Sequence, residues 1–229
     1  MTEKLFENDS FLLKGKCTVT SCKAVDGGFA VITDKTLFFP EGGGQPGDRG
    51  RLGKSRVLDT RFDEQGEIIH ICDQSLCEGR EYDMEVDPLH RLDSIQQHTG
   101  EHMLSYAFWH LFGIKNVGFH MNVSLATIDL DREVTAEEIS KAEELCNGQI
   151  YENLPVKTYY ATLGQLKNKK VRKISEKGGG RPRVVEIEGG DICTCCGTHA
   201  NFTGTVGIIK VIKCEKNRSG SRLEFLCGK

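Results

Sequence analysis

The sequence changes character near Pro88, and this change constrains the fold more than any other feature. Before Pro88, short runs of β-forming residues alternate with glycine-containing turns, as in GFAVITD and EIIHIC. From Arg91 onward, apolar residues recur at helical spacing. We therefore expect a small all-β unit at residues 1–88, followed by a mixed unit at residues 89–229.

The second unit is predicted to be α+β, with helices packed on an antiparallel sheet. Its first helix is expected at residues 92–112, although Gly100 is unfavourable inside a helix. Thr135 and Glu138 form a capping box that starts a second helix, and Pro155 marks its end. Strands are expected at residues 156–161, 183–189, 206–216 and 221–227.

Composition and charge exclude several classes of protein. The net charge is −3 at pH 7, which argues against a protein that coats nucleic acid indiscriminately. No apolar run approaches the ~20 residues that a membrane helix needs, and the N-terminus lacks the apolar segment and cleavage site of a secretory signal. We therefore expect a cytoplasmic protein whose ten cysteines are reduced, a few of them serving as metal ligands.

The first expected helix carries a histidine pair in the run QQHTGEHML. His98 and His102 are four residues apart, so their imidazoles leave the same face of a helix and can reach one ion. Taken alone, this spacing is also common among histidines that bind nothing. A second pair at the same separation, Cys195 and His199, completes a set of three imidazoles and one thiolate. That donor set favours zinc, and we predict about one Zn²⁺ per chain.

The cysteines around residue 195 leave the identity of the thiolate ligand open. In the run DICTCCGTH, Cys193 and Cys196 form a C-x-x-C pair that could itself bind zinc, and Cys196 also lies near His199. A zinc site with four protein ligands is usually structural, whereas a catalytic zinc commonly keeps one position for water. The spacing alone decides neither which cysteine binds nor whether the ion acts in catalysis.

A basic segment follows the second expected helix. Residues 167–183 hold eight basic residues and one acidic residue, although the chain as a whole is negative. The segment is either a solvated lysine-rich turn or a surface that binds phosphates. The candidate phosphate-binding residues are Lys167, Lys169, Lys170, Arg172 and Lys173.

The two metal-binding runs together resemble a known family. HTGEHML and CCGTH, with RVVEIEGGDICTCCGTH leading into the second run, resemble the editing domain of alanyl-tRNA synthetases and of the free-standing AlaX proteins. Threonyl-tRNA synthetase editing domains carry similar pairs, but Gly197 and Thr198 are similar to the alanyl type. The pattern C-x-G-T-H aligns Cys195 with the family's cysteine ligand and leaves Cys193 outside the motif.

The first half of the chain adds to this resemblance. LFFPEGGGQPGDRG, residues 37–50, is similar to the glycine-rich segment of the β-barrel domain that precedes the editing domain in these proteins. The resemblance therefore implies an N-terminal β-barrel and a complete chain of the medium-length, two-domain AlaX class. Residues 118–131 and 204–216 extend the likeness over nearly the whole second half.

The resemblance implies a trans-editing hydrolase that deacylates mischarged tRNA(Ala) at a zinc site. Serine is the expected amino acid, with glycine as a second candidate, because a pocket that selects alanine cannot strongly reject either. Two alternatives remain: a non-catalytic, zinc-stabilised tRNA-binding module, and a zinc hydrolase of small esters. The sequence does not indicate the oligomeric state.

Several residues are candidates for recognising this substrate. A buried polar group that pairs with the serine hydroxyl would leave alanyl-tRNA intact, because alanine would leave that group unpaired. The candidates for this group are Thr127 and Asp129, in a strand expected to face the metal, and Thr198. The run Gly42, Gly43, Gly44 and Gln45 is either a loop that holds the acceptor end of tRNA or a tight turn between barrel strands.

Overall fold

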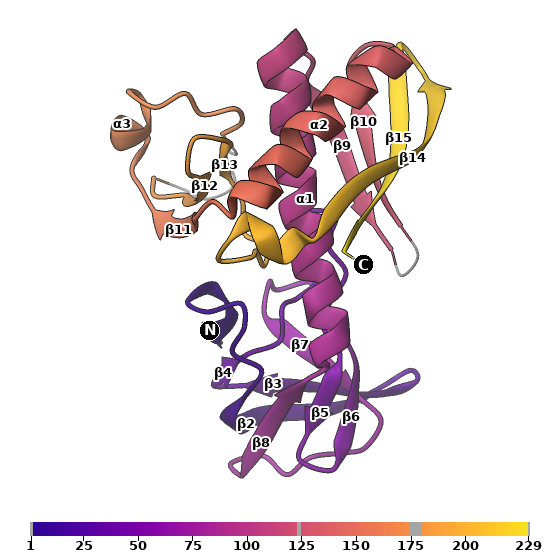
Figure 1. Ribbon diagram of the computed structural model, residues 1–229. Coiled ribbons are helices and arrows are strands. Elements are labelled where there is room, and N and C mark those ends of the chain that lie inside the picture. The colour runs from indigo at the N-terminus through magenta and orange to yellow at the C-terminus, as the bar shows by residue number, and fades with distance from the viewer. Residues whose placement is uncertain (1, 123–124, 175–179, 229) are drawn as a thin grey trace. The chain divides into compact units, whose positions relative to one another are not determined.

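The computed structural model describes residues 2–122, 125–174 and 180–228 (Figure 1). It divides into two compact units, residues 1–94 and 95–229, and the boundary lies inside helix α1 (Pro88–Phe112). The predicted α+β class is confirmed, because the chain forms a closed antiparallel barrel, further sheets and two long helices. No helix among the described residues is long and apolar enough to cross a membrane. The assignment of residues 1–88 and 89–229 as separate functional domains stays a prediction.

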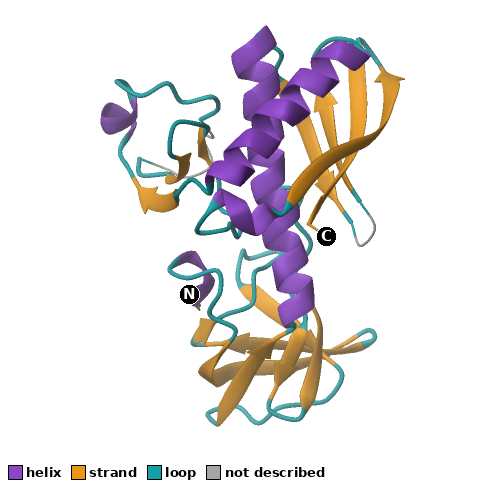
Figure 2. Cartoon of the chain, in the orientation of Figure 1, coloured by secondary structure: helices purple, strands orange, loops and turns teal. Residues whose placement is uncertain are grey.

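The first unit is built on a six-stranded barrel, drawn as orange arrows in Figure 2. Around the barrel the strand order is β2-β3-β7-β6-β5-β8, and every pair in it is antiparallel. A short parallel pair, β1 (Glu3–Lys4) and β4 (Lys35–Thr36), accompanies it, with a 3-10 turn at Leu5–Glu7. The barrel strands are β2 (Lys14–Val25), β3 (Gly28–Thr33), β5 (Gly50–Leu52), β6 (Ser55–Phe62), β7 (Ile68–Cys72) and β8 (Glu81–Val86).

Alternate residues of the barrel strands point into a common core, as a half-buried strand requires. Val19, Val31 and Leu52 are fully buried there. The first turns of α1 are held to this unit by a buried ion pair between Arg91 and Asp48, and Arg91 also donates to the carbonyl of Leu37 at 2.6 Å. A buried charge is tolerated only when it is paired in this way.

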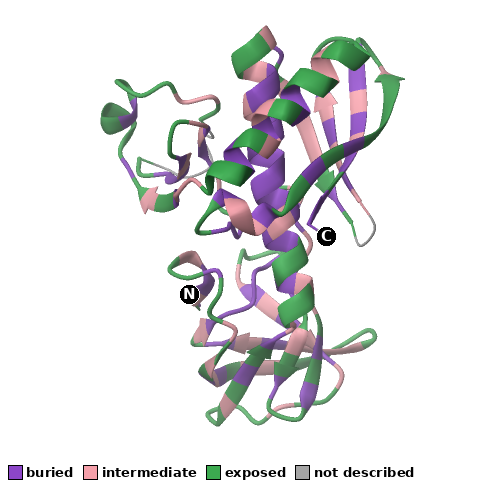
Figure 3. Ribbon diagram, viewed as in Figure 1, coloured by how far each residue is buried: buried purple, intermediate pink, exposed green. Residues whose placement is uncertain are grey.

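The second unit contains a four-stranded antiparallel sheet of order β14-β15-β10-β9. Helix α1 continues into this unit, and its middle turns are almost wholly buried (Figure 3). The predicted strands at 206–216 and 221–227 are confirmed, each within a few residues. The strands are β9 (Asn116–Met121), β10 (Ala126–Leu130), β14 (Ile208–Asn217) and β15 (Gly220–Gly228).

The helices follow the predicted signals closely. Helix α2 (Ala136–Glu152) begins at the predicted capping box, with Thr135 and Glu138 bonded reciprocally, and ends before Pro155. Helix α1 starts four residues earlier than expected and runs through Gly100. A Cβ at Gly100 would lie 2.2 Å from Cys227 Sγ, so close packing against β15 explains why glycine stands here.

A second, three-stranded sheet completes this unit. It consists of β11 (Val156–Tyr160), β12 (Arg183–Ile187) and β13 (Ile192–Thr194), with the short helix α3 (Leu163–Leu166) between β11 and β12. A 3-10 turn at Thr203–Val206 leads back to the larger sheet. Separation of the strands into two sheets was not predicted, because the hydrophobic pattern of a strand does not identify its partner.

Candidate metal centre

Helix α1 brings the two predicted histidines together in the second unit. His98 and His102 lie one turn apart on the same face, and their ring centroids are 5.5 Å apart. Both residues are only 2% exposed. The spacing predicted from the sequence is therefore realised as two adjacent, buried imidazoles.

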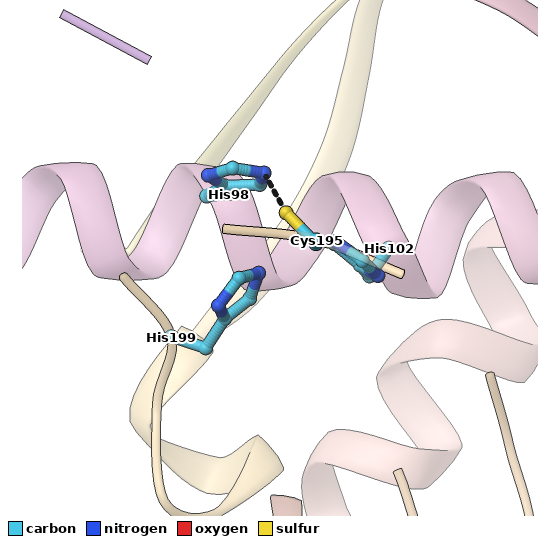
Figure 4. Close-up of side chains that lie close together, drawn as sticks. All are labelled: His98, His102, Cys195 and His199. Atoms are coloured by element: carbon cyan, nitrogen blue, oxygen red, sulfur yellow. Dashed lines mark hydrogen bonds between the residues drawn. The ribbon is translucent and has the colours of Figure 1, made fainter. Parts of the chain in front are cut away.

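The loop after β13 adds the second pair. Figure 4 shows Cys195 and His199 converging on the two helical histidines, and the dashed line joins Cys195 Sγ to His98 Nε2, 3.3 Å apart. The His199 ring lies 4.6 Å from that of His98 and 4.8 Å from that of His102. One donor atom from each of the four residues lies within 4.8 Å of the other three. The structure thus brings all four predicted ligands to one point.

Hydrogen bonds between side chains and the backbone of this loop hold it in place. Arg183 donates to the carbonyls of Cys195 and Gly197, at 3.1 and 2.9 Å. The backbone N–H of Ala200 donates to Thr99 Oγ1 on α1 at 2.9 Å. These bonds satisfy buried backbone groups and join the loop to the helix that carries the other pair.

Hydrogen bonds also determine which nitrogen of each imidazole faces the cluster. His199 Nδ1 lies 3.0 Å from the carbonyl of Gly197, and His102 Nδ1 lies 2.9 Å from Asp191 Oδ2. Carbonyl and carboxylate oxygens only accept, so both Nδ1 atoms carry the proton. The Nε2 atoms of both rings are therefore the nitrogens on the side of the cluster, an arrangement typical of ligating histidines.

The electrostatics of the cluster suit a metal ion. Burial raises the pKa of the Cys195 thiol, but His98 and His199 outweigh burial and hold that pKa well below its usual range. Burial lowers the pKa of His199 to about 3. At His102 burial also lowers the pKa, but the hydrogen bonds to Asp191 and Cys195 outweigh it and raise the pKa well above its usual range. Zinc binds a thiolate and neutral imidazoles, so its binding would release the extra proton of His102. Zinc bond lengths of about 2.0–2.3 Å place tetrahedral ligand atoms about 3.5 Å apart, close to the observed S–N separation.

The neighbouring cysteines are placed differently. Cys193 is buried outside the four-residue cluster, within 4.8 Å of ligand atoms of His102 and Asp191, and burial raises the pKa of its thiol to about 11. Cys196 is exposed. Among the described residues, these two cysteines do not share a group of potential metal ligands. The geometry therefore favours Cys195 over the alternative C-x-x-C pair.

Two residues that were not predicted to support the site form a buried chain behind His102. Asp191 accepts from His102 Nδ1 and receives both arms of the Arg172 guanidinium at 2.8 Å each. The side chains of Asp191 and Arg172 are 0% and 7% exposed. Burial raises the pKa of Asp191, but Arg172 and His102 reverse this and leave it below its usual range. Asp191 opens the run DICTCCGTH, and this position was the available sequence signal.

Comparisons with known proteins agree with this geometry. The family model of the threonyl and alanyl tRNA synthetase second additional domain matches residues 183–223, which include Cys195 and His199. The alanyl-tRNA editing protein Aarsd1 of Rattus norvegicus is 35% identical over 242 residues, covering 98% of this chain and 58% of that protein. The alanyl-tRNA editing protein AlaX-L of Pyrococcus horikoshii is 33% identical over 236 residues, with 100% and 58% coverage. The chain is a homologue of the alanyl-tRNA editing proteins.

The similarity extends to a synthetase. An alanine–tRNA ligase of Methanopyrus kandleri is 32% identical over 240 residues, which cover 99% of this chain and 26% of the ligase. The chain therefore matches a segment of a longer enzyme as well as separate editing proteins. It spans 58% of the length of the rat and archaeal editing proteins.

The structure corrects part of the predicted phosphate-binding segment. Arg172 is buried against Asp191 and does not present its guanidinium to solvent. Lys169 is paired with Glu186 and also donates to Tyr159 Oη at 2.9 Å. Lys167, Lys170 and Lys173 are exposed. Residues 175–179, within the same segment, lie outside the described residues.

Two of the three candidates for reading the serine hydroxyl do not face the cluster. Ile128 in β10 pairs with Phe119 in β9, whose ring lies 5.2 Å from that of His98. Thr127 and Asp129 flank Ile128 and so point to the opposite face of the sheet. Asp129 is bound there by Arg222 at 2.7 and 2.8 Å. The prediction that this pair faces the metal is wrong. The third candidate, Thr198, is buried in the loop that carries Cys195 and His199.

The glycine run of the first unit forms a tight turn. The N–H groups of Gly42 and Gln45 each donate to the other residue's carbonyl, at 3.0 and 3.1 Å. Gly43 and Gly44 have φ values of 63° and 89°, as in a type I′ turn, where glycine is strongly favoured. The side chain of Gln45 is buried. A role of these four residues in substrate binding stays a prediction.

The assignment of the sulfur ligand leads to a direct test. Cys195→Ser is expected to lower the zinc content from about one ion per chain to well below half of that, because a hydroxyl replaces a thiolate poorly. Cys193→Ser and Cys196→Ser should keep their zinc. Metal analysis of the purified variants measures this, with the Cys195/Cys196 double variant showing whether Cys196 substitutes. Absence of zinc from Cys196→Ser, together with a full zinc content in Cys195→Ser, would contradict the assignment.

The chain of residues behind His102 leads to a second test. Asp191→Asn should weaken zinc binding about 10- to 100-fold, because the carboxylate orients the imidazole and makes it a stronger ligand. Competition with a chromophoric chelator measures the affinity. Asp129→Asn is the matched control, since that carboxylate is also bound by an arginine but lies on the opposite face of the sheet. Equal zinc affinity in the wild type, Asp191→Asn and Asp129→Asn would show that Asp191 does not contribute to zinc binding.

Proposed function

We propose that the protein is a trans-editing hydrolase that removes serine, and secondarily glycine, from mischarged tRNA(Ala). The observation that carries this proposal is the cluster of three buried imidazoles and one half-buried cysteine sulfur, in a chain homologous to alanyl-tRNA editing proteins. The reaction is hydrolysis of the ester between the amino acid and the terminal ribose. The products are the free amino acid and intact tRNA, and the enzyme acts where translation occurs, in the cytoplasm.

The donor set fits zinc, with His98, His102, Cys195 and His199 as its ligands. When bound, zinc supplies Lewis acidity, which polarises an ester carbonyl or lowers the pKa of water. The protein residues orient the ligands. Asp191 accepts a hydrogen bond from Nδ1 of His102, and the Gly197 carbonyl accepts one from Nδ1 of His199. An activated ester needs no protein nucleophile in addition.

Thr198 is the remaining candidate for selecting serine over alanine. It stands next to His199 and is buried, whereas Thr127 and Asp129 lie on the far face of the sheet. A buried polar group that hydrogen-bonds the serine hydroxyl favours serine over alanine by about 1–3 kcal/mol. Correctly charged alanyl-tRNA(Ala) would thereby be spared.

Recognition of tRNA is assigned to exposed cations. Lys167, Lys170 and Lys173 are exposed, and their segment precedes β12 and the loop that carries Cys195. Phosphates of the acceptor stem are the groups such lysines would neutralise. The turn Gly42–Gln45 is the second candidate contact, since Gly43 at its tip is exposed and glycine lets another backbone approach closely.

A closed four-ligand cluster also supports an alternative, in which zinc is structural and the protein binds tRNA without cleaving it. The test incubates purified, zinc-loaded protein with seryl-tRNA(Ala), alanyl-tRNA(Ala) and a free serine ester. We expect rapid release of serine from seryl-tRNA(Ala), slow release of alanine, and little cleavage of the free ester. Removal of zinc by a chelator should abolish the activity, and zinc should restore it. Binding without cleavage would establish the alternative, and equal cleavage of the free ester would indicate a small-ester hydrolase.

The cationic segment gives a separate prediction. Replacement of Lys167, Lys170 and Lys173 by glutamate should weaken tRNA binding and reduce its salt dependence, with a slope smaller by about 0.7–0.9 for each phosphate that is no longer neutralised. Filter binding over a range of salt concentrations measures both quantities. The matched control replaces Lys210, Lys213 and Lys216 on β14, each of which is already paired with a glutamate. An unchanged slope in the first variant would show that the segment is only a solvated turn.

A further inference from the structure

Helix α1 carries a third functional group between the two histidines. Glu101 directly precedes His102, and its side chain is 8% exposed. Among the described residues, Glu101 forms no ion pair with a lysine or arginine, and its one ionisable neighbour within ion-pair distance is His102. Arg172 interacts with Glu101 only at longer range. A buried carboxylate that no lysine or arginine contacts directly is costly, so such a residue indicates a function.

One oxygen of Glu101 is firmly held. Oε1 accepts from Ser105 Oγ at 2.6 Å and from Asn116 Nδ2 at 2.7 Å. Asn116 Nδ2 also donates to Ser105 Oγ at 2.8 Å, so the three side chains form a closed group. Ser105 is fully buried one turn further along α1. This clamp fixes the carboxylate and determines where its second oxygen points.

The second oxygen points toward the metal-binding cluster. Glu101 Oε2 lies 3.8 Å from His102 Nε2, the nitrogen that faces the cluster because Nδ1 is bound by Asp191. Within the described parts of the chain, no hydrogen-bond donor contacts Oε2. Glu101 is also not a member of the four-residue cluster itself. Beside the cluster there is thus an oriented carboxylate oxygen with capacity to bind a cation.

The substrate class brought to this site, if the proposed function holds, supplies a matching cation. An aminoacyl ester carries an α-ammonium group one carbon from the carbonyl whose bond to the ribose oxygen is cleaved. The other carboxylate beside the cluster, that of Asp191, is already committed to Arg172 and His102. We propose that Glu101 Oε2 binds the α-ammonium group of the aminoacyl ester and orients its carbonyl toward the metal centre.

This assignment gives Glu101 a role in selectivity. A charged ammonium donates to the carboxylate through a charge-assisted hydrogen bond, whereas an N-acylated amino acid offers only a neutral amide. The site should therefore favour free aminoacyl-tRNA over tRNA whose amino acid is blocked by an acyl group. The contact acts on every amino acid alike, so discrimination between serine and alanine depends on other residues.

The test compares Glu101→Gln with the wild type, both loaded with zinc. The amide keeps the length of the side chain and can still accept from Ser105 and Asn116, but its NH₂ group repels an ammonium at the Oε2 position. We expect kcat/KM for seryl-tRNA(Ala) to fall about 10- to 100-fold, as for loss of a hydrogen bond to a charged group. For N-acetylseryl-tRNA(Ala), kcat/KM should change less than about threefold, because that substrate forms no charged bond to Glu101 in the wild type. Glu137→Gln, an exposed residue of α2, is the matched control.

A second arm measures binding without hydrolysis. The probes are 3′-seryl-amino-3′-deoxyadenosine, in which an amide replaces the ester, and its N-acetyl form. The wild type should bind the free amine at least tenfold more tightly, and Glu101→Gln should abolish this preference. Because no bond is cleaved, this arm tests the ammonium contact even if the wild type proves unable to hydrolyse seryl-tRNA(Ala).

Three results would overturn the proposal. Equal decreases in kcat/KM on the free and N-acetylated substrates would assign Glu101 to bond cleavage or to folding. A lower zinc content in Glu101→Gln would make Glu101 part of the metal site. If Glu101→Gln keeps the wild-type preference for the free amine in both the kinetic and the binding measurements, another residue binds the α-ammonium group.

Discussion

The contact between one turn of helix α1 and the loop after β13 is the constraint on which the second unit depends. Three buried imidazoles meet a half-buried cysteine sulfur, and such a concentration of polar groups is unfavourable unless they bind one another or an ion. Secondary contacts hold the two segments in register, from Arg183 to the loop carbonyls and from Ala200 to Thr99. The close approach of β15 at Gly100 leaves this stretch of α1 little freedom to shift.

Two buried carboxylates lie beside this contact, and their surroundings differ. Asp191 is neutralised by Arg172 on one side and orients His102 on the other, so a buried carboxylate adds no uncompensated charge. Glu101 differs, since its clamp consists of the neutral groups of Ser105 and Asn116. Asp191 therefore orients a candidate metal ligand, whereas Glu101 keeps one oxygen that can accept a hydrogen bond from a bound molecule. This difference between two buried carboxylates beside His102 is the basis for assigning them different roles.

Short sequence motifs predicted local structure correctly, but they did not reveal which side chains pair across long distances in the sequence. The capping box of Thr135 and the spacing of His98 and His102 depend on residues within one turn, and both are confirmed. Arg172 lies among lysines, so its pairing with Asp191, 19 positions away, could not be inferred from its neighbours. The error at Thr127 and Asp129 was avoidable, because the apolar residues that alternate with them already place both on the polar face of β10.

The set of four candidate ligands and the position of Glu101 bear on the same question, namely how a metal bound by four protein ligands could act on an ester, as the proposed function requires. If an ion is already surrounded by protein donors, its value in catalysis depends on bringing the carbonyl close in one orientation. A carboxylate that binds the α-ammonium fixes the substrate at the atom next to that carbonyl. In the proposed function, the ester would then be held from two sides, by the Glu101 oxygen and by a metal bound to the four candidate ligands. Precise orientation of this kind lowers the barrier for attack by water without a nucleophile from the protein.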